Sequence, residues 1–381
     1  MQVKWVKLKN FRNYNEAVVE FSSRINLISG QNGQGKTNLV EAVMLNALSK
    51  SPRTSHDEDL KMQGETHTEA EVCVTRNYGD VTIKCVLDSE CGKKFFVNSN
   101  EVKKVSDIFG SLVAVYFSPN DLKIVSESPA ERRDFMDTDI SQLSGSYYNL
   151  LQRYNKILFQ RNKLLKTVHD RTLLADQIDI WNEQLASVAG YIVKTRKNFI
   201  EKLKEPAKQT MKYMTKEADN LDIIYIGAQG ETAEEIKAEI LKSLKFNFEK
   251  DIELGYTSVG SHRDDIKFAL NGKDAKVFAS QGQQRSIVLA LKLAEIEVFE
   301  KEIGEKPILV LDDVFSELDS SRQKKLYDKF EGGQVLMTGT AFRFKPAEDY
   351  LALTVKNGVV KSKMVSKKTS LLTQMSKNGK I

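Results

Sequence analysis

The sequence contains few cysteines and no long apolar run. Its 381 residues include three cysteines, at positions 73, 85 and 91, which lack the spacing of a zinc site. So few cysteines argue against a disulfide framework and indicate reduced thiols in a cytoplasmic protein. No run approaches about 18 consecutive apolar residues, so we expect no transmembrane helix. The segment MQVKWVKLKNF has neither an apolar core nor a cleavage site, so we expect no secretion signal.

The sequence also has little excess charge of either sign. It contains 57 Lys and Arg and 52 Asp and Glu, which give a formal net charge of +5. This balance permits nucleic acid as a partner but does not establish it. The bias is stronger at the end, where residues 361–381 contain six lysines and no acidic residue. We expect a disordered, solubilising tail there in preference to a DNA-contacting arm.

The first hundred residues alternate in the manner of strands, with one helical segment between them. The segments predicted as strands are 3–8, 17–21, 25–28, 70–76, 81–87 and 93–97. Apolar residues at helical spacing predict a helix over 39–48. The open segment SGQNGQGKTN, residues 29–38, therefore joins a strand to a helix.

Helical periodicity dominates the middle of the chain. Ser128, Pro129 and Glu131 predict the start of a helix with a capping box. Two apolar stripes, over 147–168 and 181–203, predict an αα-hairpin whose arms are each about 45 Å long at about 1.5 Å per residue. These stripes are packing faces, and we assign no chemistry to them.

The last third returns to strands and ends in a βαβ pattern. Residues 221–227 read as a strand, and Asn271-Gly272 predicts a hairpin over 266–278. A helix over 283–299, a strand over 307–313, a helix over 320–330 and a strand over 334–340 imply a parallel sheet shared with 25–28. We predict an α/β fold: one discontinuous domain of 1–120 and 220–365, a helical lobe over 121–219, and a basic tail over 366–381.

The open segment matches the phosphate-binding loop G-x-x-x-x-G-K-[ST]. Gly30, Gly35, Lys36 and Thr37 occupy the defined positions, with Gln31, Asn32, Gly33 and Gln34 between them. Glycines let the backbone N–H groups turn inward and let phosphate approach, and the following helix adds its N-terminal partial charge. Lys36 is predicted to reach the β and γ phosphates of ATP, and Thr37 to hold Mg²⁺.

Two carboxylates follow the apolar strand ILVL. Asp312 is placed at the carboxyl end of a buried parallel strand, where ligands bind. We predict that Asp312 completes the Mg²⁺ site with Thr37, and that Asp313 orients or deprotonates an attacking water. An acidic turn without a role is the alternative when this pair is considered alone.

The segment SQGQQ begins the helix that precedes those carboxylates. Ser280 and Gly282 at a helix N-terminus form an anion-binding tip, and Gln281 and Gln283 belong to the same turn. Ser280 is equally explained as an ordinary N-cap. The residues alone leave both interpretations open.

Together these motifs resemble the RecF family of ABC-type ATPases, which is related to the SMC and Rad50 heads. The resemblance runs from about residue 1 to 365 and is carried by motifs in a fixed order: LKNFRNY (8–14), the phosphate loop, SPNDLKIVSESPAERRDFMD (118–137), TSVGSHRDD (257–265), SQGQQR (280–285) and LDDVFSELD (311–319). It implies an ABC-type ATPase head with mixed parallel and antiparallel sheets and an inserted α-helical lobe. The insert is too short for SMC or Rad50 themselves.

The resemblance also implies roles for residues and partners. Ser280, Gln281, Gly282 and Gln283 would close over the nucleotide of a second copy, and Asp319 would lie near that copy's site. Arg12 resembles a basic position that approaches nucleotide, and a solvated loop arginine is the equal alternative. The implied activity is ATP-dependent homodimerisation on duplex and gapped DNA in repair, recombination, replication and the SOS response. RecR and RecO would act with the chain to help RecA load onto DNA.

Several positions depart from the patterns of related ATPases. Asn120, Glu127 and Ser261 differ from the usual family residues, but they lie outside the phosphate loop and the carboxylates. The broader ABC class has Glu at the position of Asp313 and a His near Thr338. This chain has neither residue, and RecF proteins resemble it in lacking both. A shorter base and a missing His predict slow hydrolysis. We expect Arg132 and Arg133 on a surface face, and residues 262–265 in a structural hydrogen-bond cluster.

Three alternatives remain open. An ABC transporter ATPase subunit shares the nucleotide motifs, but it needs a membrane partner and normally a switch His. A structural DNA clamp with a vestigial ATPase has the same fold without using hydrolysis. A small-molecule kinase is disfavoured because it has no need of SQGQQ or SELD.

Overall fold

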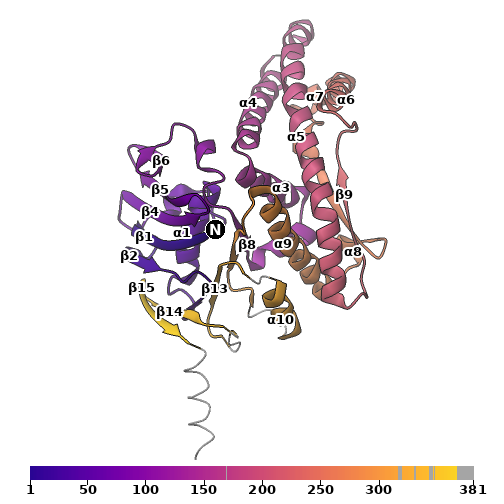
Figure 1. Ribbon diagram of the computed structural model, residues 1–381. Helices are drawn as coiled ribbons and strands as arrows, with labels where there is room; N and C mark the ends of the chain where they lie inside the picture. The colour runs from indigo at the N-terminus through magenta and orange to yellow at the C-terminus, as the bar shows by residue number, and fades with distance from the viewer. Residues whose placement is uncertain (169, 316–319, 330–331, 343–345, 347, 367–381) are drawn as a thin grey trace, which may run out of the picture. The chain divides into compact units, whose positions relative to one another are not determined.

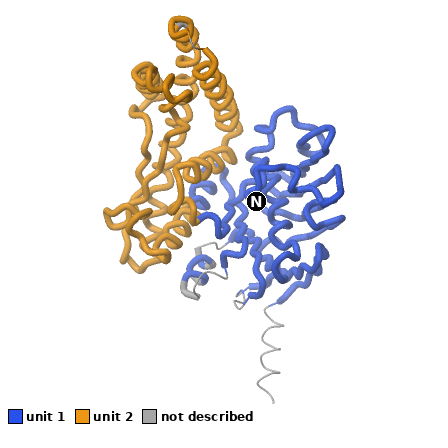
Figure 2. Tube along the Cα trace, turned by 180° about the vertical axis from the view of Figure 1, so that it is seen from behind, with its two compact units in different colours: residues 1–121, 295–381 blue, residues 122–294 orange. Residues whose placement is uncertain are grey.

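The computed structural model of the chain describes residues 1–168, 170–315, 320–329, 332–342, 346 and 348–366 (Figure 1). The chain divides into two compact units, shown in two colours in Figure 2: Met1–Asp121 with Glu295–Ile381, and Leu122–Ala294. The predicted lobe boundary at 219 differs from this division, because residues 220–294 pack with the helical insert. Within the described residues, no helix is both long and apolar enough to cross a bilayer.

One layer of the first unit is an antiparallel sheet with the strand order β2-β1-β4-β5-β6-β7. Its strands are β1 (Gln2–Phe11), β2 (Tyr14–Glu20), β4 (His67–Arg76), β5 (Gly79–Asp88), β6 (Gly92–Val97) and β7 (Asn100–Glu101). Alternate side chains of β1, including Val6 and Leu8, are buried on one face, as expected of a sheet that packs on a core. The strand predictions for this region are confirmed.

The second sheet of this unit has the order β15-β14-β3-β13-β12-β8. Its strands are β3 (Ile25–Ser29), β8 (Ala114–Phe117), β12 (Ile308–Leu311), β13 (Val335–Gly339), β14 (Tyr350–Lys356) and β15 (Val359–Val365). All neighbouring pairs are parallel except β14 and β15. The βαβ pattern therefore does share a sheet with the strand before the open loop, as predicted.

Helix α1 (Lys36–Leu48) contacts strands of both sheets of this unit, including β1, β4 and β13. Its side chains are buried on nearly all sides, and they form one apolar cluster with residues of both sheets. This packing fixes the start of α1 at the end of β3. The phosphate loop is therefore held between a buried strand and a buried helix.

The three cysteines are free thiols in the first unit. Cys73 and Cys85 are buried in the antiparallel sheet, and burial raises the pKa of Cys85 to about 12. Cys91 is exposed in the turn between β5 and β6. The three therefore differ sharply in their access to solvent.

The second unit is mostly helical with a small antiparallel sheet of order β11-β10-β9. Its elements are α2 (Lys123–Ser126), α3 (Pro129–Leu143), α4 (Gly145–Thr167), α5 (Arg171–Thr215), β9 (Leu221–Ile226), α6 (Ala233–Phe246), α7 (Phe248–Leu254), β10 (Asp265–Leu270), β11 (Lys273–Asp274) and α8 (Ala275–Phe278). Helix α9 (Gln281–Ile303) begins in this unit, and α10 (Ser320–Lys329) belongs to the first.

The predicted αα-hairpin is formed by α4 and α5, which pack against each other. Its arms are unequal, because α4 has 23 residues and α5 has 45. At 1.5 Å per residue they span about 35 Å and about 68 Å. Helix α5 continues beyond α4 because it also packs on α6 and β9, as Figure 1 shows.

One local prediction fails in this unit, and another is confirmed only in part. Ser128 does precede α3, but its side chain makes no cap hydrogen bond. The Glu131 N–H donates instead to the main-chain oxygen of Ser128 at 3.2 Å. The hairpin turn at Asn271-Gly272 is present, but its second strand has only two residues. The Asp274 side chain caps the short helix α8 there and ends the strand.

Candidate nucleotide-binding site

The phosphate loop links the end of β3 to the first turn of α1. The backbone has positive φ at Gly33 (78°) and Gly35 (113°), and helix α1 starts directly afterwards at Lys36. The N-terminus of a helix carries unpaired N–H groups and a positive partial charge, which favour an anion. The local backbone is therefore built as an anion cradle.

The glycines of the loop serve packing as much as phosphate access. A Cβ at Gly30 would lie 2.5 Å from the carbonyl oxygen of Val355, and a Cβ at Gly35 would lie 2.7 Å from the Asn13 side chain. Only at Gly33 does a Cβ meet nothing within 4 Å. The prediction that the loop glycines keep space for phosphate therefore fits Gly33, whereas Gly30 and Gly35 make room for neighbouring parts of the protein.

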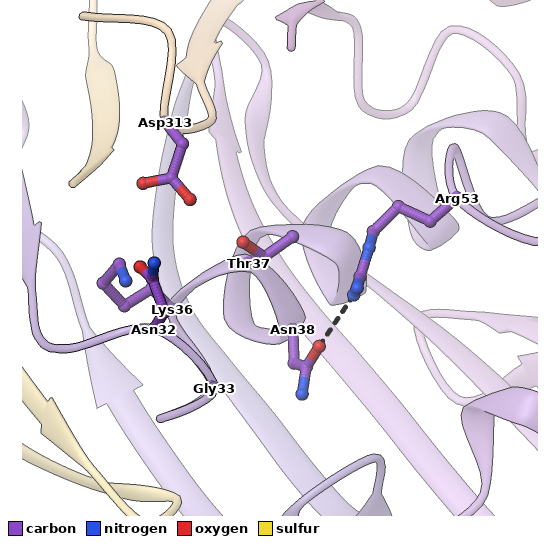
Figure 3. A pocket seen from close by; sticks show the side chains of 8 residues that line it. Asn32, Gly33, Lys36, Thr37, Asn38, Arg53 and Asp313 are labelled. Atoms are coloured by element: carbon purple, nitrogen blue, oxygen red, sulfur yellow. Dashed lines mark hydrogen bonds between the residues drawn. The ribbon is translucent and has the colours of Figure 1, made fainter. Parts of the chain in front are cut away.

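A pocket of about 260 Å³ lies over this cradle (Figure 3). The Asp313 carboxylate faces Thr37 and Lys36 across it, and the Lys36 Nζ donates a hydrogen bond to the Gln31 carbonyl at 3.1 Å. The lining residues are Asn32, Gly33, Gly35, Lys36, Thr37, Asn38, Arg53 and Asp313. Six residues of the predicted site therefore meet in one pocket.

The other predicted loop residues line a second pocket of about 520 Å³. Gly30, Gln31 and Gln34 contribute to it together with the loop after β13 and the end of β14. The Gln34 main-chain oxygen accepts hydrogen bonds from Asn13 Nδ2 (3.0 Å) and from the Gly358 N–H (3.1 Å). The turns β1–β2 and β14–β15 thus brace the loop from its outer side.

Asp312 stands at the carboxyl end of β12 and is 5% exposed. Its Oδ1 accepts hydrogen bonds from Thr37 Oγ1 at 3.0 Å and Thr338 Oγ1 at 2.6 Å, and its Oδ2 accepts one from Tyr116 Oη at 2.9 Å. A hydroxyl and a carboxylate in contact beside a phosphate cradle are the hard oxygen donors that Mg²⁺ takes with phosphate. The residues present therefore fit the predicted metal site.

Asp313 has a left-handed backbone, with φ of 56°. This conformation is unfavourable for a residue with a side chain, by roughly 1–3 kcal/mol, and it occurs at functional sites. The Asp313 N–H donates to Thr338 Oγ1 at 2.9 Å, which helps to hold the turn. As a result the two adjacent carboxylates point differently: Asp312 contacts Thr37, and Asp313 lines the pocket.

Arg12 and Arg53 both pair with the buried Glu41, and the nucleotide contact of Arg12 stays a prediction. Arg12 pairs with the buried Glu41 through Nε (3.0 Å) and Nη2 (2.7 Å) and does not belong to the pocket lining. Arg53 does line the pocket, and its Nη1 donates to Asn38 (2.8 Å) and Glu41 (3.0 Å). Sequence reasoning missed Arg53, because no motif marks the SPRTS segment that carries it.

The segment SQGQQ, residues 280–284, belongs to the second unit. Ser280 Oγ accepts from the Gln283 N–H at 3.2 Å, and the Gln283 side chain accepts from the Ser280 N–H at 3.0 Å, which is a capping box. The N-cap interpretation of Ser280 is therefore confirmed. Ser280, Gln281 and Gly282 are nevertheless exposed at the start of α9. Asp319 lies outside the described residues.

The motif at 257–265 is part of a polar network inside the second unit. Arg132 is 5% exposed, and its Nε donates to Asp265 at 2.6 Å, so the prediction of a surface Arg132 is wrong. Arg133 is half-buried and donates to the Asp264 carbonyl at 2.8 Å. These arginines are drawn inward because the acidic pair of the motif is itself buried or half-buried.

His262 belongs to the same network. Its Nδ1 meets Tyr154 Oη at 2.7 Å and its Nε2 meets the Thr257 carbonyl at 3.0 Å. Burial lowers the pKa of His262 to about 4, and burial raises the pKa of Asp264 to about 6. The Asp264 carboxylate accepts from Arg196 at 3.0 Å. This geometry supports a structural role for the cluster.

Comparisons with known proteins agree with the geometry. A family model described as the RecF/RecN/SMC N terminal domain matches residues 2–357. The DNA replication and repair protein RecF of Alkaliphilus oremlandii is 42% identical over 368 residues, covering 94% of this chain and 100% of that protein. The protein of the same name from Ruminiclostridium cellulolyticum is 42% identical over 346 residues, covering 89% and 93%.

Solved structures give the same result at the level of the fold. The structure of the recombination mediator protein RecF with ATP, in the RecFOR pathway, superposes with a TM-score of 0.89 at 34% identity, covering 95% of this chain and 97% of that one. An Smc head domain from Pyrococcus furiosus superposes with a TM-score of 0.56 at 14% identity over 99% of each chain, which shows the shared fold. With its phosphate loop, paired carboxylates and near full-length relatives, the chain belongs to the RecF family.

Proposed function

We propose that the chain is a cytoplasmic, ATP-dependent DNA-binding protein of recombinational repair and replication restart. The observation that carries this proposal is the contact between Thr37 and Asp312 beside the phosphate loop, 3.0 Å long and contributed by residues 275 positions apart. Such a contact is what a nucleotide with Mg²⁺ requires of this fold. The relative described with ATP supports the choice of nucleotide.

The chain's own residues would divide the chemistry among them. Lys36 would neutralise charge on the β and γ phosphates, and the loop N–H groups would orient them. Thr37 and Asp312 would hold Mg²⁺, which supplies charge neutralisation of the phosphate oxygens when bound. Asp313 would orient the attacking water from across the pocket. An aspartate reaches less far than a glutamate, so we infer slow hydrolysis that works as a timer.

The second half of the proposal is a composite site. Ser280, Gln281, Gly282 and Gln283 would dock on the γ-phosphate held by a second copy, with Asp319 near the same site. The exposure of Ser280 and Gly282 at a helix N-terminus supports this, because such an end attracts phosphate when it is accessible. Hydrolysis would then remove the shared ligand and loosen the dimer.

The dimer would bind duplex and gapped DNA mainly through phosphate contacts of Lys and Arg. Relatives are named for DNA replication and repair, and one is described as a recombination mediator in the RecFOR pathway. We therefore infer that RecR and RecO are partners and that loading of RecA is the outcome of the reaction. The same proposal includes a preference for gaps and for junctions between single-stranded and duplex DNA.

The proposal is tested by Ser280→Arg, which places a long cation where a second copy would dock. ATP binding should survive, whereas ATP-dependent dimers seen by light scattering and hydrolysis should disappear. Thr232→Arg is the matched control, because Thr232 also begins a helix with a capping box in the same unit. Dimers that persist in the Ser280→Arg protein, or that vanish equally in Thr232→Arg, would refute the composite site.

A DNA-binding assay distinguishes the proposed function from that of a transporter ATPase subunit. Gel shifts at increasing salt, with and without ATP, should show salt-sensitive binding to duplex DNA. A structural clamp with a vestigial ATPase predicts instead that Asp312→Asn leaves ATP-dependent DNA binding intact. We expect that substitution to abolish the ATP dependence.

A further inference from the structure

Two hydroxyl side chains outside the known motifs hold the Asp312 carboxylate. Tyr116 comes from β8 and Thr338 from β13, the two strands that flank β12 in the parallel sheet. Tyr116 pairs in register with Val310, two residues before Asp312, and reaches forward to Oδ2 at 2.9 Å. Thr338 approaches Oδ1 at 2.6 Å.

The two hydroxyls act on different oxygens of one carboxylate. Oδ1 accepts from Thr338 and Thr37, whereas Oδ2 accepts from Tyr116. A carboxylate that accepts hydrogen bonds at both oxygens cannot rotate about its Cβ–Cγ bond without losing a charge-assisted hydrogen bond. Its orientation is therefore set by the sheet before any metal arrives.

We propose that Tyr116 and Thr338 are positioning residues that orient the Asp312 carboxylate for the Mg²⁺ of a bound nucleotide. The inference rests on the proposed nucleotide-binding function and deepens it. Partners that hold a metal-binding side chain contribute to metal affinity, and their loss typically weakens it about 10- to 100-fold.

Tyr116 is suited to this role because its hydroxyl donates to Oδ2, the Asp312 oxygen that accepts neither the Thr37 nor the Thr338 hydrogen bond. Phenylalanine fills the same space without donating, so Tyr116→Phe removes the hydrogen bond and leaves the packing in place.

Thr338 has a second contact that distinguishes it from Tyr116. Its fully buried hydroxyl also accepts the N–H of Asp313, the residue with the left-handed backbone. One side chain thus links the metal-holding carboxylate to the water-orienting one. Thr338→Val is nearly isosteric and removes both contacts, and Thr338→Ser restores the hydroxyl.

The test measures the affinity of a fluorescent ATP analogue, mant-ATP, in excess Mg²⁺ and in EDTA. In the wild-type protein the ratio of the two dissociation constants reports how much Mg²⁺ contributes to binding. We expect Tyr116→Phe and Thr338→Val to reduce this ratio about 10-fold or more, with the value in EDTA unchanged. Tyr78→Phe and Thr66→Val, which alter exposed side chains of the same unit, should keep the wild-type ratio.

Hydrolysis adds a second readout. At saturating Mg²⁺ the Tyr116→Phe protein should recover wild-type turnover, because only metal affinity is lowered. The Thr338→Val protein should remain slow, because Asp313 has lost an anchor, and Thr338→Ser should restore it. Thermal unfolding of each variant shows whether the fold is retained.

The outcomes separate this inference from the function on which it rests. A wild-type protein that binds mant-ATP equally in Mg²⁺ and EDTA overturns the metal site and this inference together. A normal wild-type ratio with an unchanged ratio in Tyr116→Phe overturns the positioning role alone. Equal loss of affinity in Mg²⁺ and EDTA also overturns it, because it shows a merely structural effect.

Discussion

Glu41 on α1 is fully buried between two guanidinium groups, those of Arg12 and Arg53. Its oxygens also accept from Ser51 Oγ at 2.6 Å. A buried charge is tolerated only when it is paired and hydrogen-bonded. The carboxylate therefore holds the β1–β2 turn and the segment after α1 next to the phosphate loop, and it keeps Arg53 at the pocket wall.

We predict that Glu41→Ala lowers the free energy of unfolding by about 3 kcal/mol, because it leaves a partly buried Arg12 without its carboxylate. Urea denaturation followed by circular dichroism measures this. Glu16→Ala, at an exposed position of β2, is the control and should change stability by less than about 0.5 kcal/mol. Equal stability of the two variants would contradict the role given to Glu41.

His262 gives a pH prediction with a definite sign. Burial lowers its pKa to about 4, below the value of about 6.5 in an unfolded chain. Between these pH values the unfolded chain binds more protons, so the stability from neutral His262 is present above pH 6.5 and is lost toward pH 4. The advantage of the wild type over His262→Gln should therefore shrink by about 1.4 kcal/mol per pH unit in this window.

Urea denaturation at pH 7, 6 and 5 tests this comparison. The raised pKa of Asp264 acts in the opposite direction, since its protonated form stabilises the fold as the pH falls through about 6. Comparing wild type and variant at the same pH removes the contribution of Asp264 to first order. A stability difference that stays constant from pH 7 to 5 would refute the prediction.

The site residues that the sequence predicted best are those placed by a short motif or by the end of a buried strand. Lys36, Thr37 and Asp312 follow from a short motif and a buried strand, and the structure brings them together. Arg53 and Tyr116 were missed because their importance comes from contacts with residues far along the chain. A prediction from local spacing cannot supply such long-range partners.

At the scale of elements, the β14–β15 hairpin reaches the phosphate loop from more than 300 residues away in sequence. The Asn357 N–H donates to Gln34 Oε1 at 2.8 Å, and the Gly358 N–H donates to the Gln34 carbonyl at 3.1 Å. A Cβ at Gly358, where φ is 74°, would lie 2.4 Å from the Asn13 carbonyl oxygen. The β14–β15 hairpin therefore packs closely beside the phosphate loop and holds it through these hydrogen bonds.

We predict that Gly358→Ala weakens ATP binding and destabilises the fold by about 1–3 kcal/mol, because backbone atoms must move to admit the methyl group. Isothermal titration calorimetry and urea denaturation measure the two effects. Gly64→Ala is the matched control: its φ is 90° but nothing lies within 4 Å of its Cβ. Its loss of stability should come from backbone strain alone, with ATP affinity unchanged. Equal ATP affinity in both variants would exclude the bracing role.

Sequence periodicity predicted the helical hairpin and the fully apolar strand, but it missed several other elements. The α4–α5 hairpin and β12 were predicted, whereas β8, α6, α7, β14 and β15 were not. Strand β15 is mostly exposed and rich in lysine, so its composition is that of a tail. It is a strand because it pairs along its whole length with β14. Pairing of this kind is a tertiary property and leaves little trace in local composition.

At the scale of the whole molecule, the net charge of +5 is small, so the proposed DNA binding would depend on where the basic side chains lie. We predict that log affinity for duplex DNA falls linearly with log salt, and that the slope becomes steeper with ATP because two copies would contact phosphates in the proposed dimer. Fluorescence anisotropy across a salt series measures both slopes. In the Ser280→Arg protein ATP should leave the slope unchanged. An identical slope with and without ATP in the wild type would contradict the prediction.

The different exposure of the cysteines has a practical consequence. Cys91 is open to solvent, whereas Cys73 and Cys85 are buried and burial raises the pKa of both thiols. Thiolates are the reactive form, so a maleimide dye at neutral pH should attach to Cys91 and spare the other two. The native chain thus offers a single labelling position for energy transfer between donor- and acceptor-tagged copies, through which the rise and decay of the proposed association can be followed in real time.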